Sequence, residues 1–179
     1  SIRDNGFQFR IDHDLGQSGG WRQQLWGLHS GKDLQLNDIG YLDRNNFNYL
    51  RYEINRRIGS YPETSRYAGS FWRYAASIRY NDRGQHLWDA VAVNRQSETR
   101  NGGNEFWEIA MFGAGHDDLI LRGNGVVKVP EKIISHYEGF WPRRGYWSFY
   151  VESRIAAEGL EGAKGMGATF YLEPQYHFN

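Results

Sequence analysis

Apolar and polar residues alternate along much of the chain with the two-residue period of β-strands. Between Tyr49 and Ile58 the even positions include Leu50 and Tyr52, whereas the odd positions are mainly polar or charged, as at Arg51. Helical periodicity is nearly absent. No stretch approaches the roughly 18 consecutive apolar residues that a membrane-spanning helix requires. The pattern therefore predicts an all-β fold.

The same alternation marks several further strands, which we place at 71–80, 85–95, 106–112, 146–155 and 169–178. The run Asn81-Asp82-Arg83-Gly84 has the residues of a tight hairpin turn. Polar, glycine-bearing loops are expected at 97–104 and 159–167, and a short hairpin within 113–130. Pro174 predicts an edge strand or a bulge, because proline lacks the N–H that a central strand donates. Strands separated by short turns predict antiparallel, up-and-down pairing.

The predicted strands are about ten residues long, whereas strands in soluble sheets average five or six. A tilted strand that crosses a membrane needs about 9 to 11 residues. Length and alternation together favour an antiparallel up-and-down β-barrel of the outer-membrane type, either complete or partial. We treat residues 1–179 as a single barrel domain or barrel segment. The alternative is a soluble antiparallel β-sandwich with one solvated face.

A membrane barrel turns apolar side chains to lipid and polar ones to its lumen. The expected lumen-lining residues are Arg51, Glu53, Arg57, Arg73, Arg79, Glu108, Glu152, Arg154 and Glu173. Tryptophans gather at the two membrane interfaces of such proteins. The expected interface aromatics are Trp72, Trp88, Trp107, Trp141 and Trp147.

Composition narrows the function classes. Lys and Arg number 21, as do Asp and Glu, so the net charge is zero and nucleic-acid binding is disfavoured. The absence of cysteine excludes disulfides, thiol catalysis and cysteine-based zinc sites. The chain begins Ser1-Ile2-Arg3 without a methionine or an apolar signal core, which favours an excised segment over a processed protein.

No catalytic, metal or cofactor motif emerges from the spacing of reactive residues. The six histidines form no HxxxH, HxH or HExxH pattern, and the triplet 116–118 (His-Asp-Asp) is expected to be a solvated loop. Glu105, Glu108, Glu152 and Glu173 offer carboxylates for glycoside hydrolysis, but their spacing favours structural ion pairs. The aromatic and basic run 140–147 suits a barrel-anchoring interface loop better than a sugar-stacking surface.

One run resembles a known family. The stretch 34–45, with the sequence LQLNDIGYLDRN, is similar to a motif of a bacterial outer-membrane β-barrel family of unknown function. In that family the barrel follows an N-terminal carbohydrate-binding-like module that resembles family nine xylan binders. The resemblance implies an outer-membrane location, a missing N-terminal module of the same protein and a link to oligosaccharides. It carries no catalytic residues to this chain, and the run itself also suits a turn in which Gly40 has a positive φ.

We therefore expect an outer-membrane barrel segment with a charged lumen that acts as a channel, a translocator or a membrane anchor. It contacts outer-membrane lipid, needs no cofactor and is not an enzyme. Two alternatives remain: a soluble glycan-binding β-sandwich that uses exposed tryptophans, and a jelly-roll glycoside hydrolase that uses paired glutamates. Both are water-soluble, so a requirement for detergent separates them from the barrel.

Overall fold

A computed structural model describes residues 5–16, 19–31, 46–118, 120, 125–159 and 164–178. These ranges contain strands, turns and bends but no helix, and hence none long and apolar enough to cross a membrane. The all-β prediction is confirmed. The run 34–45 that carries the family resemblance lies outside the described residues.

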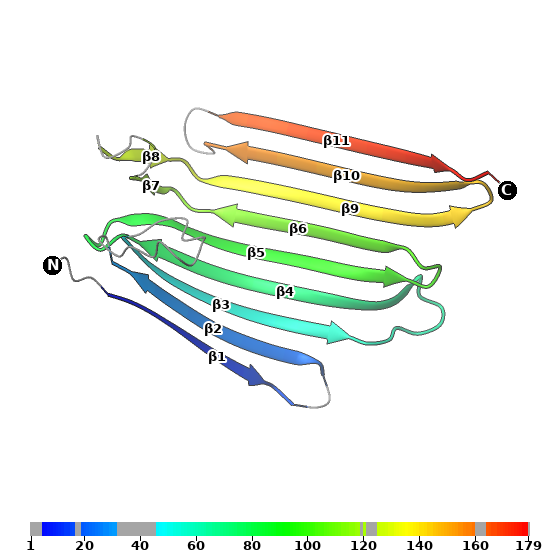
Figure 1. Cartoon of the computed structure of the whole chain (residues 1–179), viewed down its shortest axis with the longest axis horizontal. Helices are drawn as coiled ribbons and strands as arrows, with labels where there is room; N and C mark the ends of the chain where they lie inside the picture. Colours follow the sequence, from blue (N-terminus) through cyan, green and yellow to red (C-terminus); the bar gives the residue numbers. More distant parts are fainter. Residues whose placement is uncertain are drawn as a thin grey trace.

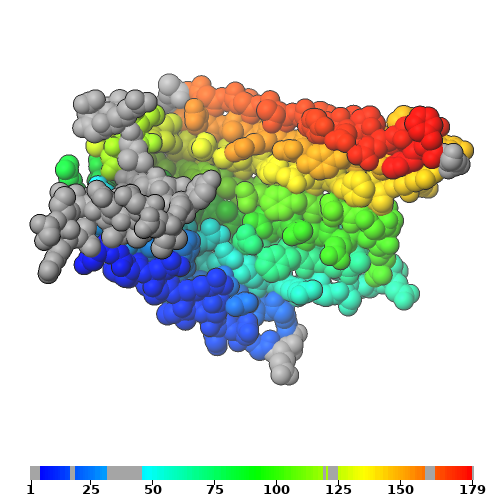
Figure 2. All heavy atoms as spheres, in the orientation of Figure 1, coloured from blue at the N-terminus to red at the C-terminus, as the bar shows by residue number. Residues whose placement is uncertain are grey.

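Nine strands form one antiparallel sheet (Figure 1). In spatial order they are β1 (Gly6–Asp14), β2 (Trp21–Ser30), β3 (Phe47–Ile58), β4 (Tyr67–Tyr80), β5 (His86–Thr99), β6 (Asn104–Phe112), β9 (Lys132–Arg144), β10 (Trp147–Glu158) and β11 (Gly165–Tyr176). Each strand lies beside its neighbours in sequence, so the sheet is an up-and-down meander. In the described ranges a short hairpin of β7 (Gly115–Asp117) and β8 (Val127–Val129) is inserted between β6 and β9. In the space-filling view the chain colours follow the same order across the visible face (Figure 2).

The tight turns form where the sequence predicts them. Between β4 and β5, the Oδ1 atom of Asn81 accepts hydrogen bonds from the backbone N–H groups of Arg83 and Gln85, at 3.1 and 3.0 Å. Gly84 has a φ of 75°, a left-handed conformation that costs glycine little. The residues of this turn thus satisfy its backbone locally, and β4 and β5 are held in register from one end.

The strands of the main sheet contain 9 to 14 residues, as long as or longer than the alternation predicts. The edge position expected from Pro174 is confirmed, because β11 lies at one end of the sheet. The run 140–147 is not mainly a loop: 140–144 belong to β9 and only 145–146 form the turn. Pro142 fits there because it lies beyond the last residue pair between β9 and β6, Phe140 with Asn104.

The sheet is not closed in the part of the chain that the structure describes. β1 pairs only with β2, and β11 only with β10, so each presents one unpaired edge. The finding supports an antiparallel up-and-down sheet and leaves the closed barrel unconfirmed.

Little of the sheet is buried. The largest buried cluster contains Phe47, Tyr49 and Leu87, with Trp26, Leu28 and Trp88 packed against it. Tyr49 makes an edge contact with Trp26, and the ring centroids are 5.2 Å apart. The cluster lies near the end of the sheet that carries the β4–β5 turn, beside the β7–β8 hairpin. Elsewhere the described sheet is a single layer.

Candidate functional site

Strand register divides the side chains of the sheet between two faces. Residues directly paired across antiparallel strands lie on the same face, and neighbours along a strand lie on opposite faces. One cross-strand row runs through Trp21, Arg56, Trp72, Arg95, Trp107 and Tyr137. We call this set the aromatic row and the face that carries it the apolar face. The other face, which carries Arg51, Glu53 and Glu108, is the polar face.

Among the described residues, no element covers the apolar face. Its exposed residues include Phe7, Phe9, Ile11, Leu50, Tyr52, Tyr74, Val91, Ile109, Met111, Ile155, Met166 and Phe170, with exposed fractions from 39% to 83%. Within the described strands, the charged side chains of this face include Arg56 and Arg95 in the aromatic row, Glu105 and Arg144 beyond it, and Asp89 near the opposite end. A wide band free of fixed charge therefore lies between these limits. Soluble monomers rarely present a contiguous apolar patch of more than a few hundred Å² to water.

The aromatic row is held together by ring and cation–π contacts. Trp72 and Trp107 meet edge to face, with ring centroids 5.6 Å apart. The guanidinium carbon of Arg56 lies 5.0 Å from the ring centroid of Trp21, and that of Arg95 lies 5.2 Å from Trp72. Alternating aromatic and cationic groups have an apolar body and a polar tip, which suits a boundary between an apolar phase and water.

A buried carboxylate pairs with an exposed arginine beyond the aromatic row. Glu105 is 7% exposed, and its two carboxylate oxygens accept hydrogen bonds from Arg66 at 2.7 and 2.6 Å. Tyr67 donates a further hydrogen bond to Glu105 at 2.8 Å. The hydrogen bond from Arg66 to the Tyr67 hydroxyl, together with the nearby Glu105 carboxylate, raises the pKa of the Arg66 guanidinium. The carboxylate of Glu105 is thus neutralised by its neighbours.

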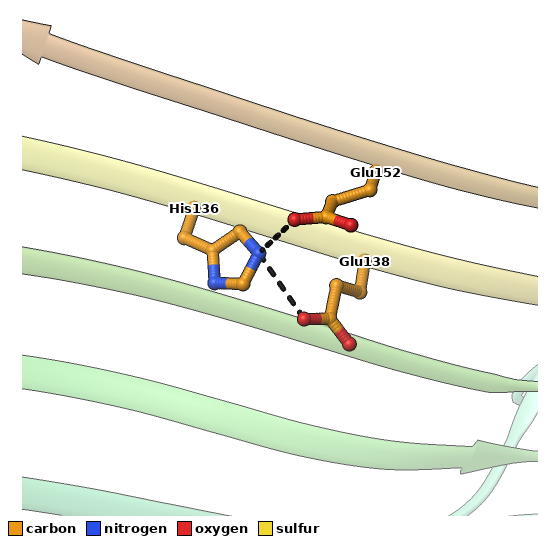
Figure 3. A group of neighbouring side chains, drawn as sticks. All are labelled: His136, Glu138 and Glu152. Atoms are coloured by element: carbon orange, nitrogen blue, oxygen red, sulfur yellow. Dashed lines mark ion pairs between the residues drawn. The ribbon is translucent and has the colours of Figure 1, made fainter. Parts of the chain in front are cut away.

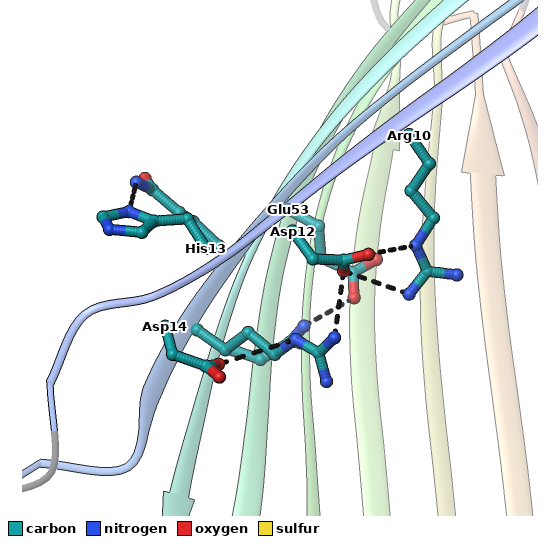
Figure 4. A network of polar contacts seen from close by, with 8 residues as sticks. Arg10, Asp12, His13, Asp14 and Glu53 are labelled. Atoms are coloured by element: carbon teal, nitrogen blue, oxygen red, sulfur yellow. Dashed lines mark hydrogen bonds and ion pairs between the residues drawn. The ribbon is translucent and has the colours of Figure 1, made fainter.

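The polar face carries networks of charged side chains. Glu53, whose side chain is 12% exposed, accepts hydrogen bonds from Arg51 at 2.7 Å and from Asn55 at 2.8 Å, and Arg73 lies 3.3 Å away. Near the β1 edge, Asp12 pairs with Arg10 at 2.9 Å. Figure 4 shows Arg10 and Asp12 on the side of β1 opposite to His13. The charges in these two networks are therefore paired locally.

This face is hollowed beside the first network. A pocket of about 290 Å³ is lined by Gln8, Arg10, Gln24, Trp26, Arg51 and Glu53, all on the polar face. An aromatic ring surrounded by amide and charged groups can contact a polar solute through both stacking and hydrogen bonds.

A second pocket, of about 410 Å³, separates the β7–β8 hairpin from the main sheet. Arg79, Trp88, Phe112, Lys132 and Glu158 line its sheet side, and His116 and Val129 line its hairpin side. The Nδ1 atom of His116 lies 3.0 Å from the backbone oxygen of His86. The hairpin thus lies over one end of the polar face.

The triplet His116-Asp117-Asp118 is engaged with the protein rather than simply solvated. All three residues are partly buried, and the side chains of Asp117 and Asp118 accept hydrogen bonds from Ile120 and Asn81. The sequence-based expectation of a solvated loop is therefore wrong in detail, because the adjacent β4–β5 turn supplies partners that lie far away in sequence.

One cluster of side chains on the polar face was not predicted from the sequence. His136 and Glu138 on β9 and Glu152 on β10 bring one nitrogen and two carboxylate oxygens within 4.8 Å of one another. His136 and Glu138 have an i, i+2 spacing that places both on one face of a strand, which is the local signal. Glu152 joins them only through register, where it pairs directly with Glu138.

The structure places all nine expected lumen-lining residues on the polar face: Arg51, Glu53, Arg57, Arg73, Arg79, Glu108, Glu152, Arg154 and Glu173. Of the carboxylates considered for hydrolysis, Glu105 instead lies on the apolar face. Glu152 has Glu138 as its direct cross-strand partner, rather than any of the other three.

The expected interface aromatics divide between the faces. Trp72, Trp107, Trp141 and Trp147 lie on the apolar face, whereas Trp88 lies on the polar face opposite Arg79. The β4–β5 pairing shifts between Arg79 and Tyr80, where Leu87 is an extra residue. Beyond this bulge Val91 and Val93 face the apolar side, and Trp88 faces the polar side.

Comparisons with known protein families, curated proteins and solved structures give no match to this chain. The function proposed for this chain therefore rests on its fold and on its two faces.

Proposed function

We propose that this chain is part of the wall of an outer-membrane β-barrel, with its apolar face toward lipid and its polar face toward a hydrated lumen. The observation that carries the proposal is the uncovered band free of fixed charge on the apolar face of a single-layer sheet. In water such a band loses hydrophobic stabilisation of about 25 cal/mol per Å² left exposed. Lipid removes this cost and leaves the opposite face to carry the charges.

The aromatic residues at the two ends of the apolar face support the same orientation. Along β4, Trp72 in the aromatic row and Tyr80 at the other end are eight residues apart, or about 26 Å at about 3.3 Å per residue, and the row of Ile78 and Asp89 lies two residues before Tyr80. A strand tilted by about 40° converts this length into a depth of about 20 Å, close to the apolar band of about 25 Å in outer-membrane barrels. The aromatic row then lies at one membrane interface, where Trp, Tyr and Arg are enriched.

The two sheet edges require further pairing in this setting. In hydrocarbon each unsatisfied backbone N–H or C=O group costs several kcal/mol, so the outer edges of β1 and β11 are paired in the functional barrel. An antiparallel meander of nine strands directs β1 and β11 the same way. Antiparallel closure therefore takes an odd number of additional strands, which makes the total even, as in bacterial single-chain barrels.

The soluble alternatives fit less well. A β-sandwich needs a second sheet against the apolar face, and in the described ranges the only second sheet is β7–β8, which borders the polar face. The resemblance of run 34–45 to an outer-membrane family agrees with the barrel proposal. It also supports a role as channel, translocator or anchor for a glycan-related module.

Fractionation of the full-length protein from its host tests the proposal directly. We expect recovery in the outer membrane and a heat-dependent shift of gel mobility in detergent, since closed barrels resist unfolding by detergent without heating. Recovery as a folded, soluble species overturns the proposal.

The channel role has its own test, because Arg57 and Arg56 are adjacent but lie on the polar and apolar faces. In planar bilayers, Arg57→Gln should shift the ion selectivity of the full-length protein toward cations, since it removes a positive charge from the lumen. Arg56→Gln is the matched control and should leave the selectivity unchanged. Equal effects of the two substitutions would contradict the assignment of faces, and the absence of conductance would exclude the channel role.

A further inference from the structure

The cluster of His136, Glu138 and Glu152 has the arrangement of a metal site (Figure 3). The Nε2 atom of His136 lies 3.1 Å from Oε1 of Glu138 and 3.3 Å from Oε1 of Glu152. The two carboxylates and the imidazole come from neighbouring strands of a regular sheet, so their backbone positions are fixed by the β9–β10 hydrogen-bond ladder.

The charges around the cluster favour a cation. Glu138 and Glu152 are direct cross-strand partners, a placement that is unfavourable for two carboxylates unless a positive charge lies between them. Glu108 is the cross-strand partner of His136 on β6, and Arg154 is its partner on β10. Three carboxylates thus surround His136 against one guanidinium, which leaves a local excess of negative charge.

The imidazole nitrogen that faces the carboxylates lacks a hydrogen bond. Nε2 of His136 is shielded from solvent and makes no hydrogen bond of acceptable geometry, although both carboxylates are close. The ring is held in place by Phe106, in an edge contact with centroids 5.7 Å apart. The Tyr150 hydroxyl lies 3.3 Å from Oε2 of Glu152, and Oε1 is the oxygen nearest to His136. Such outer contacts orient the ligands of metal sites.

We propose that His136, Glu138 and Glu152 bind a divalent transition-metal ion of the Zn²⁺ class. Tetrahedral Zn²⁺ has bonds of about 2.0–2.1 Å to imidazole nitrogen and carboxylate oxygen, which places its ligand atoms about 3.3 Å apart. The two nitrogen–oxygen separations in the cluster match this spacing. One nitrogen with two oxygens suits Zn²⁺ better than Ca²⁺, which takes six to eight oxygen ligands. Three protein ligands leave one position for water or a solute on the polar face.

The proposal does not depend on a membrane location, so the two can fail separately. The direct test is equilibrium dialysis of the tag-free full-length protein, kept folded in its native medium, against ZnCl₂. We expect one Zn²⁺ per chain, with X-ray absorption showing imidazole nitrogen and carboxylate oxygen at about 2.0–2.1 Å. His136→Ala, Glu138→Gln and Glu152→Gln should each weaken binding at least tenfold.

Two control variants keep the chemistry but move it away from the cluster. His13→Ala removes an exposed histidine on β1, and Glu173→Gln removes a carboxylate from the same polar face. Both should bind Zn²⁺ within about twofold of the unaltered protein. Circular dichroism verifies that each variant is folded. If His136→Ala does not fold, the two glutamine variants still test the site, because glutamine preserves the shape of the glutamate side chain.

Two results would overturn the metal site. One is no Zn²⁺ uptake at about 100 μM. The other is uptake that survives the triple variant, which would place the bound ion elsewhere.

Discussion

Placing a positive charge in the middle of the apolar band is the sharpest perturbation that the structure suggests. Val91 lies on β5 and is 52% exposed. It is four residues from Arg95, which belongs to the aromatic row. Four residues along the strand correspond to about 13 Å, or about 10 Å of depth for a strand tilted by about 40°. Val91→Arg therefore puts a guanidinium near the midplane of the band.

The cost depends on what covers this face. In lipid, an arginine at the midplane of a barrel destabilises the fold by about 2–4 kcal/mol, a change of about 30- to 1000-fold in the unfolding equilibrium. In water, the same change at a half-exposed position shifts stability by no more than about 0.5 kcal/mol. Tyr80→Arg, near the end of β4, is the depth control and should cost about 0–1 kcal/mol in lipid.

Denaturant titration of the full-length protein in lipid vesicles, followed by tryptophan fluorescence, measures both variants. Val91→Ala accounts for the lost packing of the valine side chain. If Val91→Arg unfolds at the same denaturant concentration as Tyr80→Arg, no depth dependence exists, and the assignment of this face to lipid is refuted.

Two further predictions concern the ends of the sheet. Arg66→Ala should destabilise the protein by about 1–3 kcal/mol in denaturant titration, since it removes the charged partner of buried Glu105. Adding Glu105→Gln to this variant should recover part of the lost stability. If the effects of the two substitutions simply add, the two residues are not coupled. Gly115→Ala should release the β7–β8 hairpin, because its Cβ would clash with the backbone oxygen of Leu87. The rate of amide hydrogen exchange at His116 and Asp117 should then rise at least tenfold. Gly167→Ala, whose Cβ meets open space, is the control and should leave this rate unchanged. Equal exchange rates in the two variants would show that the close approach of Gly115 to Leu87 does not hold the hairpin.

The sequence predicted the features that arise within one strand or one turn. Alternation at 49–58 assigned Arg51 and Glu53 to one face and Leu50 and Tyr52 to the other, because side chains of a strand alternate whatever lies beside it. The Asn81–Gly84 turn was equally local, since its own side chains satisfy its backbone. All nine charged residues expected to share a face do share one.

The predictions failed where partners come from elsewhere in the chain. The face of Trp88 depends on the bulge at Leu87, which is defined only by pairing with β4. The strand β9 was not recognised, because its first half, from Lys132, alternates weakly and its second half contains Pro142.

By itself, then, the amino-acid sequence determined the strand-rich architecture and the contrast between a charged face and an apolar one, because both follow from a period of two. Only the tertiary structure decided that Glu152 lies opposite Glu138 and beside His136, and that the aromatic row is continuous from Trp21 to Tyr137. It also decided that β1 and β11 are the outermost strands of the described sheet. These features depend on register between strands, and a shift of one residue would turn each side chain to the other face.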